Sequence, residues 1–280
     1  MKRFALVALI LTVICSSPAK AQNFLGILDS SITELSFPVA VNGNGETCAT
    51  LSLSSPGHSW SHISNRGVIL SGLLDGEYVN HIVVFGGSEI IDYSLCLGPV
   101  SPGDYLLTLK LDTDLSPSEN ATVHIHRIAT RTILPDDDRF SFYRYAPWLY
   151  ERVADKASDV SLLLMGYPVS KDGRTTIEYH VVFSNEDGGT GRNPAILMSR
   201  YGRISDIEWV YRVVIDETTG EIISEQYQGA GHETRDFSGD KIGLHPLLRV
   251  STDNGTFDPE GETPVRVGLE PMIFVWGVDT

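Results

Sequence analysis

The sequence predicts a mainly β fold, in which an N-terminal β-sandwich is followed by a second β-rich, antiparallel unit with few helices. Three observations predict this fold class. Short apolar runs bounded by Gly, Pro, Asn, Asp and Ser recur along the chain, as is typical of sandwich strands. Several runs alternate apolar and polar residues with a period of two. No long part of residues 22–130 has the period of an amphipathic helix.

The sequence divides into three expected segments. Residues 1–21 have the basic, apolar and small-residue order of a secretory signal peptide, with cleavage expected after Ala21. Residues 22–130 form the expected sandwich, and residues 131–280 form the second unit. The expected strands are 50–54, 68–70, 81–85, 90–96, 105–111, 122–128, 160–170, 174–184, 207–215, 221–228, 246–252 and 263–269.

Two local signals in the second unit are more specific. The pair Asp172-Gly173 lies between two apolar runs and predicts a hairpin, since this dipeptide accepts the positive φ of a tight turn. Residues 144–156 form the one helix candidate, with Pro147 in its first turn.

Composition excludes several classes of protein. The chain has 280 residues, 42% hydrophobic and 20% charged, which is globular composition. Its formal charge of −15 does not favour a nucleic-acid partner. No apolar run reaches the roughly 20 residues of a membrane-spanning helix. We therefore expect an exported protein, periplasmic or extracellular, with no transmembrane segment and an oligomeric state that the sequence leaves open.

Two cysteines follow the signal peptide, Cys48 and Cys96. In an oxidising compartment a disulfide between them is favoured, and the chain-entropy estimate gives it roughly 3–4 kcal/mol. The alternative is a pair of buried free thiols.

Alternation also predicts a polar site. The odd residues from Ile177 to Phe183 and from Ile207 to Ile215 form apolar faces. The opposite faces carry Glu178 and His180 in one run and Asp206 and Glu208 in the other. If the two runs are neighbours in one sheet, these four side chains converge.

Acidic, Gly-rich loops could supply a cation site, although neither loop has the spaced acid pattern of an EF-hand. Calcium takes six to eight oxygen ligands, and such loops supply carboxylates and carbonyls. The expected metal ligands, for Ca²⁺ or another divalent cation, are Glu186, Asp187, Asp206 and Asp253. The alternative is that these loops are ordinary tight turns, because Asn, Asp and Gly accept unusual φ values.

The same residues allow an enzyme. Asp206 and Glu208 could act as the paired carboxylates of a glycoside hydrolase, with His180 or His232 in acid–base roles. Candidates for ligand binding are Glu178, Arg203, His245 and Trp148, the last as an exposed aromatic platform. Nucleophile-elbow, phosphate-loop, His-Glu-x-x-His and dinucleotide-binding motifs do not occur in the chain.

Several short sequence motifs follow one another along the second unit in a characteristic order. They are Pro147-Trp148, the run from Ser184 to Thr190, Gly202-Arg203 with Asp206 to Tyr211, Tyr227 to Gly229 with His232, and His245 to Leu248 with Thr252 to Asn254. In this order the chain resembles a family of uncharacterised secreted bacterial proteins. More distantly it is similar to the plant vacuolar-sorting-protein-like domain and to the necrosis- and ethylene-inducing toxins of plant pathogens.

The toxin resemblance implies a β fold, a divalent cation and a membrane glycolipid headgroup as target. Asp206 and Glu208 would be the retained acids, and Trp209 occupies the place of the toxins' histidine. We therefore expect a module that binds a glycan or another cell-surface or envelope component. A polysaccharide hydrolase and a structural envelope protein are the alternatives, so the sequence leaves open whether the protein is an enzyme.

Overall fold

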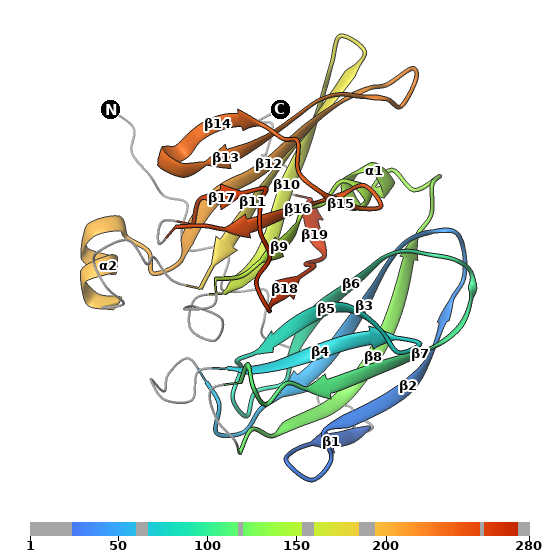
Figure 1. Ribbon diagram of the computed structural model, residues 1–280, viewed down its shortest axis with the longest axis vertical. Coiled ribbons are helices and arrows are strands. Elements are labelled where there is room, and N and C mark those ends of the chain that lie inside the picture. Colours follow the sequence, from blue (N-terminus) through green and yellow to red (C-terminus); the bar gives the residue numbers. More distant parts are fainter. Residues whose placement is uncertain are drawn as a thin grey trace, which may run out of the picture.

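The structure is a computed structural model that describes residues 24–59, 67–116, 120–152, 160–184, 194–252 and 255–273. It confirms the mainly β fold class, with antiparallel sheets and few helices. Figure 1 shows strands β1–β8 gathered in one unit and β9–β19 in another. The expected signal peptide lies outside the described residues. In the described part of the chain, no helix is long and apolar enough to cross a membrane.

The first unit consists of two four-stranded antiparallel sheets. One has the order β1 (Gly26–Leu28), β8 (Val123–Ile133), β3 (Gly45–Ser54) and β6 (Ile91–Val100). The other has the order β2 (Glu34–Val41), β7 (Gly103–Leu111), β4 (Val68–Leu74) and β5 (Glu77–Val84). Leucine, valine and isoleucine side chains from both sheets fill one core. Burying this apolar area between the sheets is what stabilises a sandwich.

The second unit has a six-stranded sheet and a smaller one. The six-stranded order is β14 (Glu233–Asp236), β13 (Ile222–Gly229), β12 (Asp206–Asp216), β11 (Arg174–Phe183), β10 (Ser161–Lys171) and β19 (Pro271–Ile273). The smaller order is β15 (Lys241–Ile242), β16 (His245–Val250), β9 (Trp148–Tyr150) and β18 (Arg266–Val267), with β17 (Phe257–Asp258) paired to β16. The other elements are α1 (Phe140–Arg144), α2 (Pro194–Tyr201) and the 3₁₀ helix η2 (Ala230–His232).

The hairpin predicted at Asp172-Gly173 is confirmed. Lys171 pairs with Arg174 across a two-residue turn. Asp172 and Gly173 have φ values of 53° and 73°. This conformation matches the right-handed twist of the flanking strands, which fixes the register of β10 on β11.

The helix expected over residues 144–156 is wrong. A short helix ends at Arg144, before Pro147, and Trp148–Tyr150 form strand β9 instead. Pro147 disfavours helical geometry in the residue before it. Strand β9 then pairs with β16 on one side and β18 on the other, and all three of its residues are buried.

The two units share a buried interface. The core of the second unit extends to Cys48, Cys96 and Val83 of the first. Arg266 is buried there, donates from Nε to Asn80 Oδ1 at 2.9 Å, and lies 5.2 Å from the ring of Trp148. A buried guanidinium needs such partners, because its desolvation is otherwise costly.

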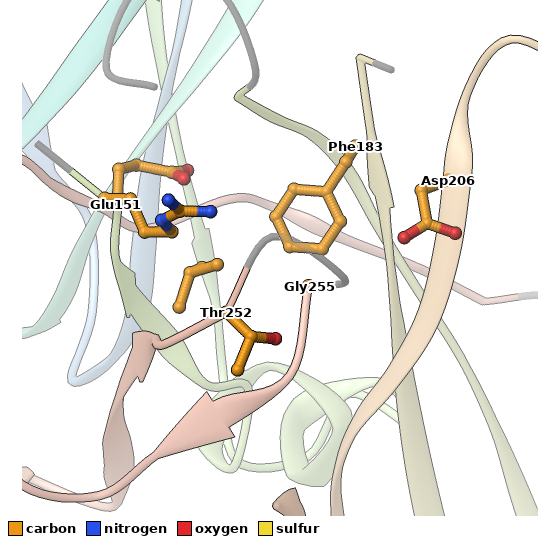
Figure 2. A pocket seen from close by; sticks show the side chains of 7 residues that line it. Glu151, Phe183, Asp206, Thr252 and Gly255 are labelled. Carbon is orange, nitrogen blue, oxygen red and sulfur yellow. The ribbon is translucent and has the colours of Figure 1, made fainter. Parts of the chain in front are cut away.

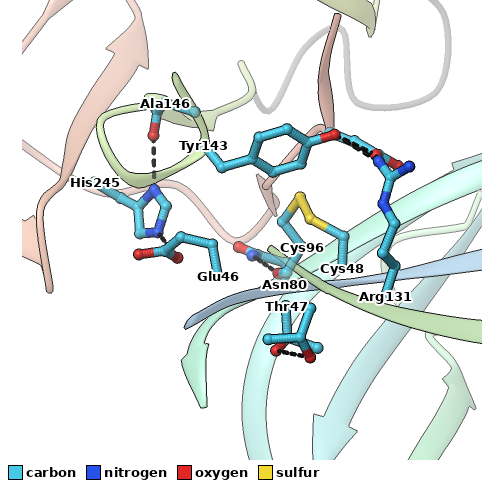
Figure 3. The surroundings of a disulfide bond; sticks show 11 residues. Glu46, Thr47, Cys48, Asn80, Cys96, Arg131, Tyr143, Ala146 and His245 are labelled. Carbon is cyan, nitrogen blue, oxygen red and sulfur yellow. Dashed lines mark hydrogen bonds and ion pairs between the residues drawn. A yellow bond between two sulfur atoms is a disulfide. The ribbon is translucent and has the colours of Figure 1, made fainter. Parts of the chain in front are cut away.

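The predicted disulfide is confirmed. Cys48 and Cys96 are bonded and lie opposite each other on the neighbouring strands β3 and β6. Figure 3 shows the bond between the side chains that join the two units. The disulfide therefore braces the first unit at the surface that contacts the second.

Candidate functional site

A β-bulge in strand β12 decides where the polar side chains point. Tyr179 of β11 pairs with Tyr211, but the next residue, His180, pairs with Trp209. Val210 is the extra residue of β12, and it and Tyr211 are both buried. An extra residue puts the side chains on its two sides out of step, so the faces of Asp206–Trp209, which precede Val210, are reversed relative to simple alternation from Tyr211 onward.

The expected convergence of the four polar side chains is therefore wrong. Asp206 lies opposite Phe183 and Glu208 lies opposite Val181, and both partners are buried core residues. Asp206 and Glu208 thus point between the two sheets of the second unit. Glu178 and His180 lie on the outer face of the six-stranded sheet.

Trp209 and Ile207 also change face. Both were expected in the core, but Trp209 pairs with His180 on the outer face and Ile207 is 41% exposed. The guanidinium of Arg212 lies 5.1 Å from the Trp209 ring, a cation–π contact.

The outer-face cluster is a closed set of hydrogen bonds around Glu178. His180 Nε2 donates to Glu178 Oε1 at 2.9 Å, and Tyr167 Oη donates to the same oxygen at 3.1 Å. Arg212 donates to Oε2 from Nε at 2.7 Å and also from Nη2. The hydrogen bond from His180, with the contribution of Arg212, lowers the pKa of Glu178 to about 2. The hydrogen bonds of Glu178 to His180 and to Arg212 therefore stabilise the outer face of the sheet.

On the inner face, Asp206 is held by Arg203. Arg203 Nη2 donates to Asp206 Oδ1 at 3.1 Å, and the backbone N–H of Ile207 donates to the same oxygen at 2.8 Å. Asp206 is 3% exposed. Arg203 thus lies beside an acid of the expected site, at the start of β12.

Glu208 forms the centre of a second group on this face. Gln228 Nε2 donates to Glu208 Oε2 at 2.7 Å, and His232 Nδ1 lies 3.4 Å from the same oxygen. Gln228 Nε2 also contacts His232 Nδ1. The left-handed backbone of His232, with a φ of 60°, turns its half-exposed side chain toward Glu208. We call Asp206, Glu208, Gln228 and His232 the acidic end of the second unit.

Gln228 was not expected from the sequence. It is 2% exposed, and among the described residues its Oε1 has no hydrogen-bond partner. The one feature of the sequence that could have indicated Gln228 is its position in the motif Tyr227–Gly229, which lies just before His232. A glutamine in a strand gives no sign of its partners until the neighbouring strand is known.

A small pocket adjoins the acidic end (Figure 2). The ring of Phe183 stands between Glu151 and Asp206, and Thr252 and Gly255 close the far side. A Cβ atom on Gly255 would lie 3.3 Å from Glu208 Cγ, which links the pocket to that carboxylate. Its volume of ≈ 10 Å³ is enough for one water-sized group. A larger ligand would therefore contact this end of the unit from outside.

Trp148 is not an exposed aromatic platform, so that expectation is wrong, and the binding candidate His245 lies buried beside it. Trp148 is 2% exposed, and its ring stacks on His245 at 4.7 Å. His245 Nδ1 donates to Ala146 O at 2.9 Å, and its Nε2 lies 3.0 Å from Glu46 Oε2 (Figure 3). These side chains connect the two units instead.

The expected cation ligands are only partly placed. Glu186, Asp187 and Asp253 lie outside the described residues. Within the described ranges, no three His, Cys, Asp or Glu side chains are grouped so as to hold a metal ion. These ranges alone therefore do not supply a cation site.

No family model and no curated protein matches the chain. Solved structures give distant likenesses. The CBM36-1 domain of a multidomain xylanase from the hindgut metagenome of Trinervitermes trinervoides is 13% identical, with a TM-score of 0.29 over 39% of this chain and 98% of that domain. Carbohydrate-Binding Module CBM36 in complex with calcium and xylotriose is 11% identical, with a TM-score of 0.27 over 38% of this chain and 100% of that chain.

NLPPya in complex with mannosamine is 13% identical, with a TM-score of 0.33 over 51% of this chain and 75% of that chain. It is a necrosis-inducing-like protein. At these identities and TM-scores the likenesses carry no conclusion about function. A functional proposal therefore rests on the side chains and the geometry of the second unit.

Proposed function

We propose that the protein binds a glycan or a similar polyhydroxylated cell-surface ligand at the acidic end of its second unit. The observation that carries this proposal is the pair of Glu208 and His232. The half-exposed imidazole of His232 lies 3.4 Å from Glu208 Oε2, at a place that a ligand can reach. Gln228 is buried and donates to the same carboxylate oxygen at 2.7 Å, so it holds Glu208 in position behind the contact surface.

The neighbouring groups suit hydroxyls rather than charges. Glu208 offers acceptor oxygens, and the half-exposed imidazole of His232 offers either a donor or an acceptor. Two adjacent sugar hydroxyls can contact the carboxylate and the imidazole at the same time. The net charge of −15 disfavours a strongly anionic ligand. A neutral glycan fits this set of groups best.

A glycan-binding screen tests the proposal. The purified protein is expected to bind one or more envelope or cell-surface glycans, and Glu208→Gln and Gln228→Leu are each expected to weaken that binding at least tenfold. Glu221→Gln is the matched control, since it makes the same change at an exposed residue next to strand β13. Binding that survives both acidic-end variants would remove this site from the proposal.

The Glu208–His232 contact favours a hydrolase as the second candidate, because the pair could transfer a proton. Its test is product analysis with the same glycans. Release of new reducing ends that Glu208→Gln abolishes would establish turnover, and intact glycans after prolonged incubation would leave binding as the function.

Export belongs to the proposal as well. A disulfide such as Cys48–Cys96 persists in oxidising compartments and is rare in the cytosol. A tagged full-length chain is expected to be recovered outside the cytoplasm and to lack its first 21 residues by mass spectrometry. Recovery of the intact chain in the cytoplasm would contradict export.

A further inference from the structure

A cavity of ≈ 160 Å³ lies between the two units. Its walls come from the edge strands β5 and β6 of the first unit, and from β10 with residues 267–269 of the second. Strand β18 packs against β5 at this place (Figure 1). The second unit thus covers the open edge of the first sandwich and leaves a cavity there. An engineered cavity of similar volume, about 150 Å³, holds benzene.

Most of the cavity lining is apolar. Val83, Val267 and Ile82 are buried, and the half-buried side chains of Phe85 and Leu162 lie nearer the surface. Apolar lining with a few placed polar groups is typical of small-molecule sites at domain interfaces.

Three buried polar side chains of the lining can donate hydrogen bonds. Ser161 Oγ has no partner among the described residues, and Ser161 is 7% exposed. Tyr93 Oη accepts the backbone N–H groups of Phe85 and Gly86, each at 3.0 Å, so its own proton points elsewhere. Burial raises the pKa of Tyr93, which keeps this proton in place.

His81 is the third donor. Its Nδ1 accepts the backbone N–H of Arg266 at 3.2 Å, so the neutral ring carries its proton on Nε2. Nε2 lies 4.0 Å from Asp112 Oδ2, beyond hydrogen-bonding distance. Burial lowers the pKa of His81, which favours the neutral ring.

The charges of the lining residues disfavour an anionic ligand. Among the described residues, no lysine or arginine lines the cavity. Asp92, the one carboxylate that these residues bring to it, is exposed at the rim and accepts a hydrogen bond from Ser52. An anionic ligand would have no cation to pair with, and its desolvation would be uncompensated. Apolar walls with neutral donors match an uncharged ring that carries an acceptor oxygen.

We propose that this inter-unit cavity binds an uncharged, ring-sized ligand with a hydrogen-bond-accepting oxygen, such as an aryl ketone. The site is separate from the acidic end and does not depend on the glycan proposal. Its donors come from both units, Tyr93 and His81 from one and Ser161 from the other. A ligand there would hold the units together.

Acetophenone is the probe, titrated against the full mature chain by saturation-transfer-difference NMR, with benzoate as the anionic comparison. We expect saturable binding of acetophenone in the millimolar range, about what a ligand of this size can reach. Benzoate is expected to bind at least tenfold more weakly. Absence of saturable acetophenone binding, or equal binding of benzoate, would overturn the proposal.

Two variants locate the site. Ser94→Phe fills the rim from a half-buried residue of β6 and is expected to weaken acetophenone binding at least tenfold, whereas Ser224→Phe, on an exposed part of β13, is the matched control. Ser161→Ala is expected to weaken binding at least threefold without lowering the melting temperature, because the hydroxyl it removes has no partner. Binding unchanged in both Ser94→Phe and Ser161→Ala would place the probe elsewhere and contradict the inference.

Discussion

His245 and Glu46 are joined at 3.0 Å, from Nε2 to Oε2, inside the interface of the two units, although 199 positions separate them in the chain. Both side chains are almost fully buried. His245 Nδ1 donates a hydrogen bond to Ala146 O, so a second hydrogen atom, on Nε2 or on the carboxyl group, joins Nε2 to Glu46 Oε2.

Removal of one partner of this pair should be strongly destabilising. We expect Glu46→Ala or His245→Ala to lower the free energy of unfolding by about 3–5 kcal/mol, since each leaves a buried polar group unpaired. Glu46→Gln should cost less, because its amide can donate to a neutral imidazole. Urea unfolding measures all three variants, and Glu34→Ala on an exposed strand residue is the control. A loss below about 1 kcal/mol in both alanine variants would show that the pair does not secure the interface.

The disulfide should contribute through the loop that it closes. Cys48 and Cys96 are 48 residues apart, and the chain-entropy estimate for such a loop is about 4 kcal/mol. We expect the double variant Cys48→Ala/Cys96→Ala to lose roughly this amount in urea unfolding. Addition of a reductant should destabilise the wild-type protein and leave the double variant unchanged. Equal sensitivity of both proteins to the reductant would contradict the assignment.

Glu178 should make the protein sensitive to acid. Its folded-state pKa of about 2 lies below the ordinary value of 4.5. The stabilising effect of this carboxylate is therefore complete above pH 4.5 and is lost as the pH falls toward 2. Glu178→Gln should lower stability at pH 6 and flatten the pH dependence between 4.5 and 2, measured as urea midpoints. Parallel curves for the wild type and the variant would show that Glu178 is not responsible.

Binding of a divalent cation at the acidic end would raise the melting temperature of the protein. A ligand that binds only the native state at a hundred times its dissociation constant adds about 2.7 kcal/mol of stability. Calcium added after a chelator should raise the melting temperature of the wild type, and Asp206→Ala should abolish the rise. Magnesium, manganese and zinc follow as comparisons. No shift with any of the four ions would argue against a cation at the acidic end and leave glycan binding to the protein groups alone.

The sequence was informative wherever structure depends on neighbours along the chain. Turn residues and period-two alternation predicted the β fold class, and the Asp172-Gly173 pair predicted a hairpin that the register of β10 on β11 confirms. The count of two cysteines beyond the expected signal peptide predicted the disulfide. The fold class and the hairpin follow from the backbone preferences of individual residues, and the disulfide follows from there being only two cysteines to pair. Both kinds of information can be read directly from the sequence.

The tertiary structure decided the candidate site. The bulge at Val210 separated Asp206 and Glu208 from Glu178 and His180, because one extra residue reverses the faces of the residues on one side of it relative to those on the other. Packing of one unit on the other buried Trp148, which the sequence predicted as an exposed platform, together with His245. Gln228 became a site residue only when β13 brought it beside Glu208. Register and burial depend on partners far away in the chain, so local patterns cannot fix them.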